Sequence, residues 1–199
     1  APTNLKQITR ATYIIPKATE RTFVNADLSA VFDECIRSLT GLTELDRVLG
    51  GGVVRGSVVL LTGEPGIGKS TLALQVLLKM GTKRTLYASG EESAKQLKLR
   101  AERLAGDASN LYILAETSLE RILENVTDLQ PDIVVVDSIQ TIGTETIDAS
   151  IGSLSQVREC ATRILQFAKE KNIPFIIVGH INKEGALAGP KVLEHIVDT

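Results

Sequence analysis

The sequence predicts an α/β fold, with a doubly wound, mainly parallel sheet and helices on both of its faces. Two observations lead to this prediction. From Leu39 onward, apolar runs of strand length alternate with helical stretches of ten residues or more, which is the pattern of βαβ units. Two of the runs, 133–136 and 175–178, are apolar at every position, as expected of central strands that helices cover on both sides.

The apolar runs predict five strands. They are expected at 57–62, 84–88, 111–114, 132–136 and 174–179. Between the strands, apolar residues at helical spacing predict helices. The first of these runs from Leu72 to Met80, after the first strand. A second stripe comprises Leu119, Ile122, Leu123, Val126 and Leu129, with Thr117 and Ser118 before it as expected caps. A later stripe comprises Val157, Cys160, Ala161, Ile164, Leu165 and Ala168.

The beginning of the chain has a different character. Its first 21 residues are rich in Thr, Lys, Arg, Asn and Pro and contain one brief apolar patch, Tyr13-Ile14-Ile15. We therefore expect an arm or linker of unclear role at 1–38 and a single folded domain at 39–199. The chain starts without Met and stops at Asp198-Thr199 with no terminating signal, so we expect a fragment whose domain is truncated at its C-terminal end.

Charge and cysteine content narrow the possible functions. The formal net charge is -2, so any contact with a nucleic acid would have to come from local loops or from several subunits together. Cys35 and Cys160 are the only cysteines, which excludes a four-cysteine zinc site within the chain and favours reduced thiols. No apolar run approaches the roughly 18 residues that cross a bilayer. We expect a cytoplasmic protein without a membrane contact.

A glycine-rich stretch joins the first strand to the first helix. GEPGIGKST fits the phosphate-binding pattern G-x-x-x-x-G-K-[ST], in the strand-to-helix context that this motif requires. Loop amides and the positive end of the helix dipole attract phosphate oxygens, Lys69 adds a charge for the β- and γ-phosphates, and Ser70 would ligate Mg²⁺. The predicted nucleotide-binding residues are Gly63, Glu64, Pro65, Gly66, Ile67, Gly68, Lys69, Ser70 and Thr71. The alternative is a glycine turn without a ligand.

Acidic residues follow two other strands at the same edge of the sheet. Asp137 ends the run 132–136 and is the expected Walker-B acid, a second anchor for Mg²⁺; the alternative is that it only caps a turn with Ser138. In SGEES, at 89–93, either Glu91 or Glu92 could orient or deprotonate the water that attacks the γ-phosphate. The two acids could equally begin a helix that Ser93 caps. The residues alone leave both interpretations open.

Further candidates follow the last predicted strand. His180 could sense the state of the phosphate, or it could be a local hydrogen-bond partner. The loops 139–153 and 182–191 are longer than plain connections, which is typical of functional loops. Lys183 and Lys191 in the second loop would suit contact with a nucleic-acid backbone, although ordinary solvated loops are the alternative.

Six segments carry a family resemblance. They include TGLTELDRVLGGG, SGEES and DIVVVDSIQT, and they span 40–75, 86–104, 111–117, 132–141, 153–161 and 178–199. Together they closely resemble the ATPase domain of bacterial RadA, also called Sms. The resemblance implies a RecA-like P-loop ATPase core that uses ATP and Mg²⁺ and assembles as a hexameric ring. It also implies binding to single-stranded DNA and a DnaB-like helicase role in homologous recombination and repair, with a recombinase such as RecA as partner.

The resemblance also implies roles for individual residues. Glu91 falls where RecA-like proteins keep the water-activating glutamate, which favours it over Glu92 and makes Lys69 and Glu91 the expected catalytic residues. His180 sits where relatives place a polar γ-phosphate sensor. The loops 141–155 and 182–191 match the DNA-facing loops of RecA-like proteins.

The chain lacks parts that the family usually has. A four-cysteine zinc finger, a Lys-Asn-Arg-Phe-Gly motif and a Lon-like domain are all missing from it. Because the missing basic motif is implicated in contacting the nucleotide or DNA, we expect this chain to bind ATP and to hydrolyse it poorly. A ring-forming regulatory ATPase that controls a protein partner is the alternative. A kinase is disfavoured because 182–191 offers no arginine lid, and a GTPase because NKEG lacks the Asp that reads guanine.

Overall fold

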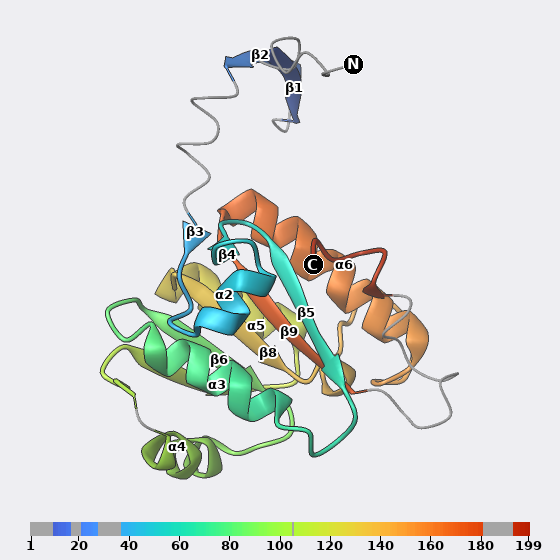
Figure 1. Cartoon of the computed structure of the whole chain (residues 1–199). Coiled ribbons are helices and arrows are strands. Elements are labelled where there is room, and N and C mark those ends of the chain that lie inside the picture. Colours follow the sequence, from blue (N-terminus) through green and yellow to red (C-terminus); the bar gives the residue numbers. More distant parts are fainter. Residues whose placement is uncertain (1–9, 17–20, 28–36, 105, 181–192) are drawn as a thin grey trace. The chain divides into compact units, whose positions relative to one another are not determined.

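The chain divides into two compact units, Ala1–Arg37 and Ser38–Thr199. The computed structural model describes residues 10–16, 21–27, 37–104, 106–180 and 193–199 (Figure 1). In the first unit, strands β1 (Arg10–Pro16) and β2 (Arg21–Asp27) pair antiparallel. These two strands are not predicted from the sequence, because their apolar patches, Tyr13-Ile14-Ile15 and Phe23-Val24, are short.

The second unit is built on a five-stranded sheet. Its strands are β5 (Val58–Gly63), β6 (Thr85–Ser89), β7 (Leu111–Ala115), β8 (Ile133–Asp137) and β9 (Phe175–His180). They lie in the order β5-β9-β8-β6-β7, and every neighbouring pair is parallel. Since parallel strands end at the same edge of a sheet, the residues that follow β5, β6, β8 and β9 come together there.

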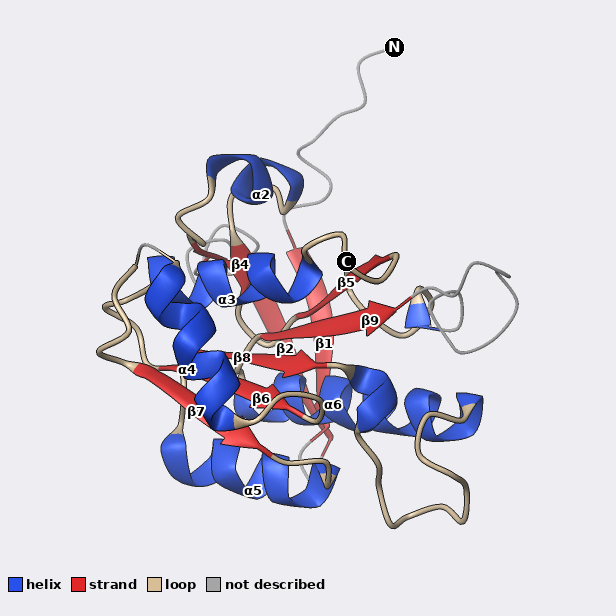
Figure 2. Ribbon diagram, turned by 90° about the horizontal axis from the view of Figure 1, so that it is seen from below, coloured by secondary structure: helices blue, strands red, loops and turns tan. Residues whose placement is uncertain are grey.

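Helices cover both faces of this sheet. They are α2 (Thr43–Val48), α3 (Lys69–Lys79), α4 (Ala94–Arg103), α5 (Leu119–Leu129) and α6 (Leu154–Lys171). Figure 2 shows α3 and α4 on one side and α5 and α6 on the other. Strand β8 serves both layers: Val134 and Val136 belong to the cluster under α5 and α6, and Ile133 and Val135 to the cluster under α3 and α4. The predicted doubly wound parallel sheet is confirmed.

Serine side chains cap three of the helices. Ser93, Ser118 and Ser153 each accept a hydrogen bond from a backbone N–H in the first turn of the helix that follows. The predicted cap at Ser118 is therefore confirmed. Among the helices of the described residues, none is long and apolar enough to cross a membrane.

All five strands end one residue later than the apolar runs predict. Four of the added residues are Gly63, Ser89, Asp137 and His180, which are polar or have no side chain. Ladder pairing joins backbone groups, so a strand continues through such a residue after the apolar pattern has stopped. The candidate residues Asp137 and His180 are thus the last residues of β8 and β9.

Candidate nucleotide site

The glycine-rich loop turns sharply from β5 into α3. Gly66 and Gly68 have φ values of 81° and 100°, in the left-handed region that favours glycine. Gly68 precedes the first turn of α3, and no side chain caps that turn. The first amides of α3 are thus left for another acceptor, as expected of an anion-binding helix end.

Lys69 lies folded over this loop. Its side chain is only 6% exposed, and Nζ donates hydrogen bonds to the carbonyl oxygens of Gly63, at 2.7 Å, and Glu64, at 2.8 Å. Burial lowers the pKa of Lys69, while the nearby carboxylates of Asp137 and Glu91 oppose that shift. The predicted loop lysine and the two predicted acids therefore converge.

Asp137 is buried, and only one of its two carboxylate oxygens has a hydrogen-bond partner within the described part of the chain. Oδ2 accepts a hydrogen bond from the Tyr87 hydroxyl, whereas Oδ1 has no hydrogen-bond partner among the described residues. Burial, together with the charge of Asp137, raises the pKa of Tyr87, so that its hydroxyl remains a donor. A buried carboxylate oxygen without a partner is costly unless a ligand satisfies it.

This open oxygen fits a magnesium ion bound together with a nucleotide. Mg²⁺ prefers oxygen ligands and is usually held by one or two protein groups plus substrate phosphates. Asp137 and Ser70, the second residue of α3, supply such groups. In the described parts of the chain, no cluster of three or more His, Cys, Asp or Glu could hold a metal by itself. A metal here would need the phosphates.

The two glutamates after β6 point to different partners. Their backbone N–H groups both donate to Ser89 Oγ, at 3.2 Å for Glu91 and 3.0 Å for Glu92. Glu92 forms an ion pair with Arg100 of α4, at 2.8 Å. Glu91 Oε1 instead accepts a hydrogen bond from Ser138 Oγ at 2.6 Å. Glu91 therefore contacts Ser138, the residue after Asp137, and Glu92 contacts α4. Because Ser93 also caps α4, both interpretations of SGEES describe part of the structure.

His180 joins the same group of residues. Its Nε2 lies 3.4 Å from Glu91 Oε1, and the register of the sheet pairs His180 with Gly63 at the start of the loop. Gln140 Nε2 donates to the His180 carbonyl oxygen at 3.1 Å. The side chain of His180 thus contacts the candidate glutamate, while its backbone is tied to the loop after β8.

Sequence reasoning missed three residues that shape this site, namely Tyr87, Ser138 and Gln140. Tyr87 left a signal, because a tyrosine within a predicted strand that helices cover needs a partner for its hydroxyl. For Ser138, the sequence suggests only a turn with Asp137. For Gln140, spacing gives no signal, since its partner is a backbone carbonyl 40 positions away.

The loop after β8 is held by a buried polar network. Gln156 is 3% exposed, accepts a hydrogen bond from the Thr144 backbone N–H and donates to the carbonyl oxygens of Thr144 and Ala149. Glu145 and Asp148 are exposed on this loop, and the sequence from 139 to 157 contains no Lys or Arg. The two predicted DNA-contact residues, Lys183 and Lys191, lie outside the described residues.

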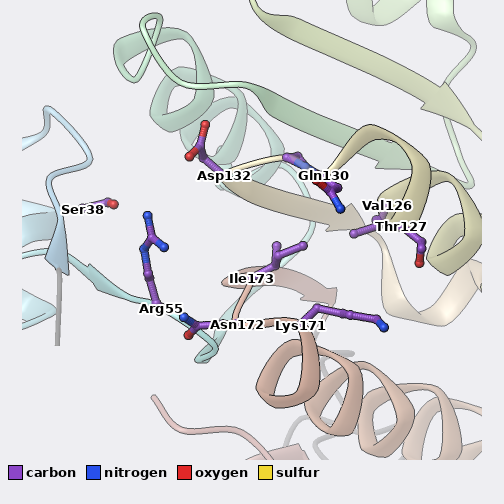
Figure 3. A pocket seen from close by; sticks show the side chains of 10 residues that line it. Ser38, Arg55, Val126, Thr127, Gln130, Asp132, Lys171, Asn172 and Ile173 are labelled. Carbon is purple, nitrogen blue, oxygen red and sulfur yellow. The ribbon is translucent and has the colours of Figure 1, made fainter. Parts of the chain in front are cut away.

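A separate cavity of about 380 Å³ opens at the opposite ends of the strands (Figure 3). Arg55, Asp132 and Ile173, which line it, precede β5, β8 and β9. None of the predicted site residues lines this cavity.

Known proteins share this sequence and fold. The AAA domain family matches residues 25–186. DNA repair protein RadA of Listeria monocytogenes is 57% identical over 162 residues, which are 80% of this chain and 35% of that protein. RadA of Aquifex aeolicus is 54% identical over 168 residues, 84% of this chain and 38% of that protein. The chain therefore spans about a third of the length of these relatives.

A solved structure shows the same fold at greater distance. The crystal structure of a KaiC-like protein from the hyperthermophilic archaeon Pyrococcus horikoshii matches with a TM-score of 0.66 and 22% identity, covering 82% of this chain and 78% of that one. The match supports a RecA-like P-loop fold. The chain belongs to the AAA domain family, and within it the sequence resembles bacterial RadA, as predicted.

Proposed function

We propose that this chain is the ATP-binding and ATP-hydrolysing core of a RadA-type protein. The observation that carries the proposal is the convergence of Lys69, Asp137 and Glu91 at the nucleotide loop. Each has the chemistry that its proposed role requires: a cation for phosphate oxygens, an open carboxylate oxygen for Mg²⁺ and a carboxylate for water.

Each residue would act on a different part of the substrate. The amides of the nucleotide loop and Lys69 would stabilise the charge on the transferring phosphoryl group. Ser70 and Asp137 would hold Mg²⁺, which would supply further positive charge for the phosphate oxygens. Glu91 would orient the water and take its proton while the water oxygen bonds to phosphorus and the bond to ADP breaks. His180 contacts Glu91 and would report the phosphate state to the segment that follows β9.

The proposed biological setting is DNA repair and recombination. RadA relatives named as DNA repair proteins support it. The chain would act within a longer protein that forms a hexameric ring on single-stranded DNA and works as a DnaB-like helicase. A recombinase such as RecA would be its partner. The acidic loop after β8 makes Lys183 and Lys191 the better candidates for contact with the DNA backbone. A regulatory ATPase that acts on a protein partner is the second candidate.

The two glutamates offer a matched test of the ATPase proposal. Glu91→Gln should retain ATP binding and lose hydrolysis, whereas Glu92→Gln, which alters the ion pair with Arg100, should hydrolyse ATP at the wild-type rate. Binding is measured by calorimetry with Mg²⁺ and hydrolysis in single-turnover reactions. Equal effects of the two substitutions would remove Glu91 from the proposed role.

A second experiment separates the two settings. Full-length protein should bind single-stranded DNA at low salt and hydrolyse ATP faster in its presence, with affinity falling as salt rises. Neither binding nor stimulation at low salt would favour the regulatory ATPase.

A further inference from the structure

A residue directly after β8 contacts Glu91 where this glutamate approaches the nucleotide loop. Glu91 follows β6 and the loop follows β5, while β8 and β9 lie between those strands. A carboxylate that starts from β6 must therefore cross the end of β8 to approach the phosphates. At that crossing, the fully buried Ser138 donates its hydroxyl to Glu91 Oε1 at 2.6 Å.

The contact engages only one carboxylate oxygen. His180 Nε2 approaches the same Oε1, at 3.4 Å, whereas no described residue donates a hydrogen bond to Oε2. Ser138, directly after β8, and His180, at the end of β9, thus face one oxygen and leave the other open. A hydrogen bond from a hydroxyl to a carboxylate is charge-assisted and therefore among the stronger contacts of this kind.

Ser138 is itself fixed by its neighbours. Thr141 Oγ1 donates to the Ser138 carbonyl oxygen at 2.8 Å, and Gly90 N donates to the Asp137 carbonyl oxygen at 3.1 Å. A Cβ at Gly90 would collide with Thr141 Oγ1, so glycine allows the turn before Glu91 to approach this closely. The hydroxyl is therefore presented from a rigid position.

We propose that Ser138 is a positioning residue, which holds Glu91 by Oε1 so that Oε2 meets the attacking water. This inference rests on the proposed ATPase function and adds to it a residue that acts through Glu91. Because its hydroxyl is engaged with Glu91, Ser138 influences the rate of hydrolysis. The affinity for ATP depends on the nucleotide loop and not on Ser138.

Ser138→Ala tests the proposal, with Ser57→Ala as matched control. Ser57 donates its hydroxyl to the Val54 carbonyl oxygen at 2.7 Å, at the other end of β5. We expect Ser138→Ala to lower the single-turnover rate constant about tenfold, the effect of one lost charge-assisted hydrogen bond, with an unchanged Kd for ATP. Ser57→Ala should match the wild type in both measurements. A wild-type rate in Ser138→Ala, together with loss of hydrolysis in Glu91→Gln, would overturn the positioning role alone.

A crystal structure of Ser138→Ala gives a reading that does not depend on turnover. The Glu91 carboxylate should move away from its position beside His180 Nε2 when the Ser138 hydroxyl is removed. An unmoved carboxylate would overturn the inference even if the wild-type chain hydrolysed no ATP, a result that would separately count against the ATPase proposal.

Discussion

Lys69 is the residue on which we expect binding of the phosphates to depend most. Its ammonium group is partly desolvated and donates to two carbonyl oxygens of its own loop. Phosphate oxygens carry more negative charge than carbonyl oxygens, so they are the better partners for the same donor. The loop thereby holds the lysine close to the position where the phosphates are expected.

Replacing Lys69 with Ala should weaken ATP binding and leave the fold intact. A charged hydrogen bond contributes about 1.5–3 kcal/mol, which corresponds to a loss of affinity of roughly 10- to 100-fold. Calorimetry with Mg²⁺ measures the affinity, and circular dichroism checks the fold. Lys79→Ala, at the exposed end of the same helix, is the control and should bind ATP as the wild type does. Unchanged affinity in Lys69→Ala would refute this role.

Tyr87 should contribute to the stability of the fold because its hydroxyl donates a hydrogen bond to the buried Asp137 Oδ2. Tyr87→Phe leaves the buried oxygen Oδ2 without its donor and should lower the free energy of unfolding by about 1–3 kcal/mol. Urea denaturation measures this quantity. Tyr112→Phe removes the same hydroxyl from a side chain that is 45% exposed and should cost little. Equal costs for the two substitutions would show that the contact with Asp137 is not stabilising.

At the scale of single residues, the sequence predicts the candidate site residues better than the residues that contact and position them. Lys69, Asp137 and Glu91 were predicted, the first from a motif, the second from the end of an apolar run and the third from family resemblance, and the structure brings all three together. Tyr87 contacts Asp137, 50 positions away, and Ser138 contacts Glu91, 47 positions away. Both contacts depend on the strand order β5-β9-β8-β6-β7. That order is not written in the spacing of apolar residues.

Among the elements, the loop after β8 is connected to two helices by one polar cluster. Thr144 of the loop donates from Oγ1 to Glu120 of α5 at 2.6 Å, and Arg163 of α6 donates to both residues. Apolar spacing predicts α5 and α6 separately. It gives no sign that their polar residues meet across the loop, because these residues lie outside the apolar stripes.

Because of this cluster, the free energy of unfolding should change with pH in the acid range. Burial alone would raise the pKa of Glu120, but hydrogen bonds from Thr144 and Arg163 outweigh it and lower the pKa from 4.5 to about 2. A carboxyl whose pKa is lower in the folded state stabilises the fold above pH 4.5, and this contribution is lost as the pH falls toward 2. We expect the stability difference between wild type and Glu120→Gln to shrink over this interval in urea denaturation. A difference that stays constant with pH would contradict the assignment.

For the whole molecule, the parallel sheet brings the carboxyl ends of β5, β6, β8 and β9 to one edge, where the candidate site lies. The cavity lined by Arg55, Asp132 and Ile173 lies at the opposite ends of the strands. The alternation of apolar runs and helices predicts this layered architecture. It does not predict β1 and β2, which form in the separate unit Ala1–Arg37, where the apolar pattern is short.

The chain as a whole should hydrolyse ATP more slowly than a full-length parent protein. It spans about a third of the length of its RadA relatives and lacks the Lys-Asn-Arg-Phe-Gly motif. Steady-state hydrolysis is measured for both proteins with single-stranded DNA present. Equal rates would show that the missing segments contribute nothing to turnover.

The central claim is that a nucleotide binds at the amino end of α3 with its metal beside Asp137. A crystal structure with Mg²⁺ and a non-hydrolysable ATP analogue tests it most directly. We predict that Lys69 Nζ leaves the carbonyl oxygens of Gly63 and Glu64 for the β- and γ-phosphates, with Mg²⁺ near Asp137 Oδ1 and Glu91 facing the γ-phosphate. Phosphates bound elsewhere, with Lys69 still donating to its own loop, would contradict the claim.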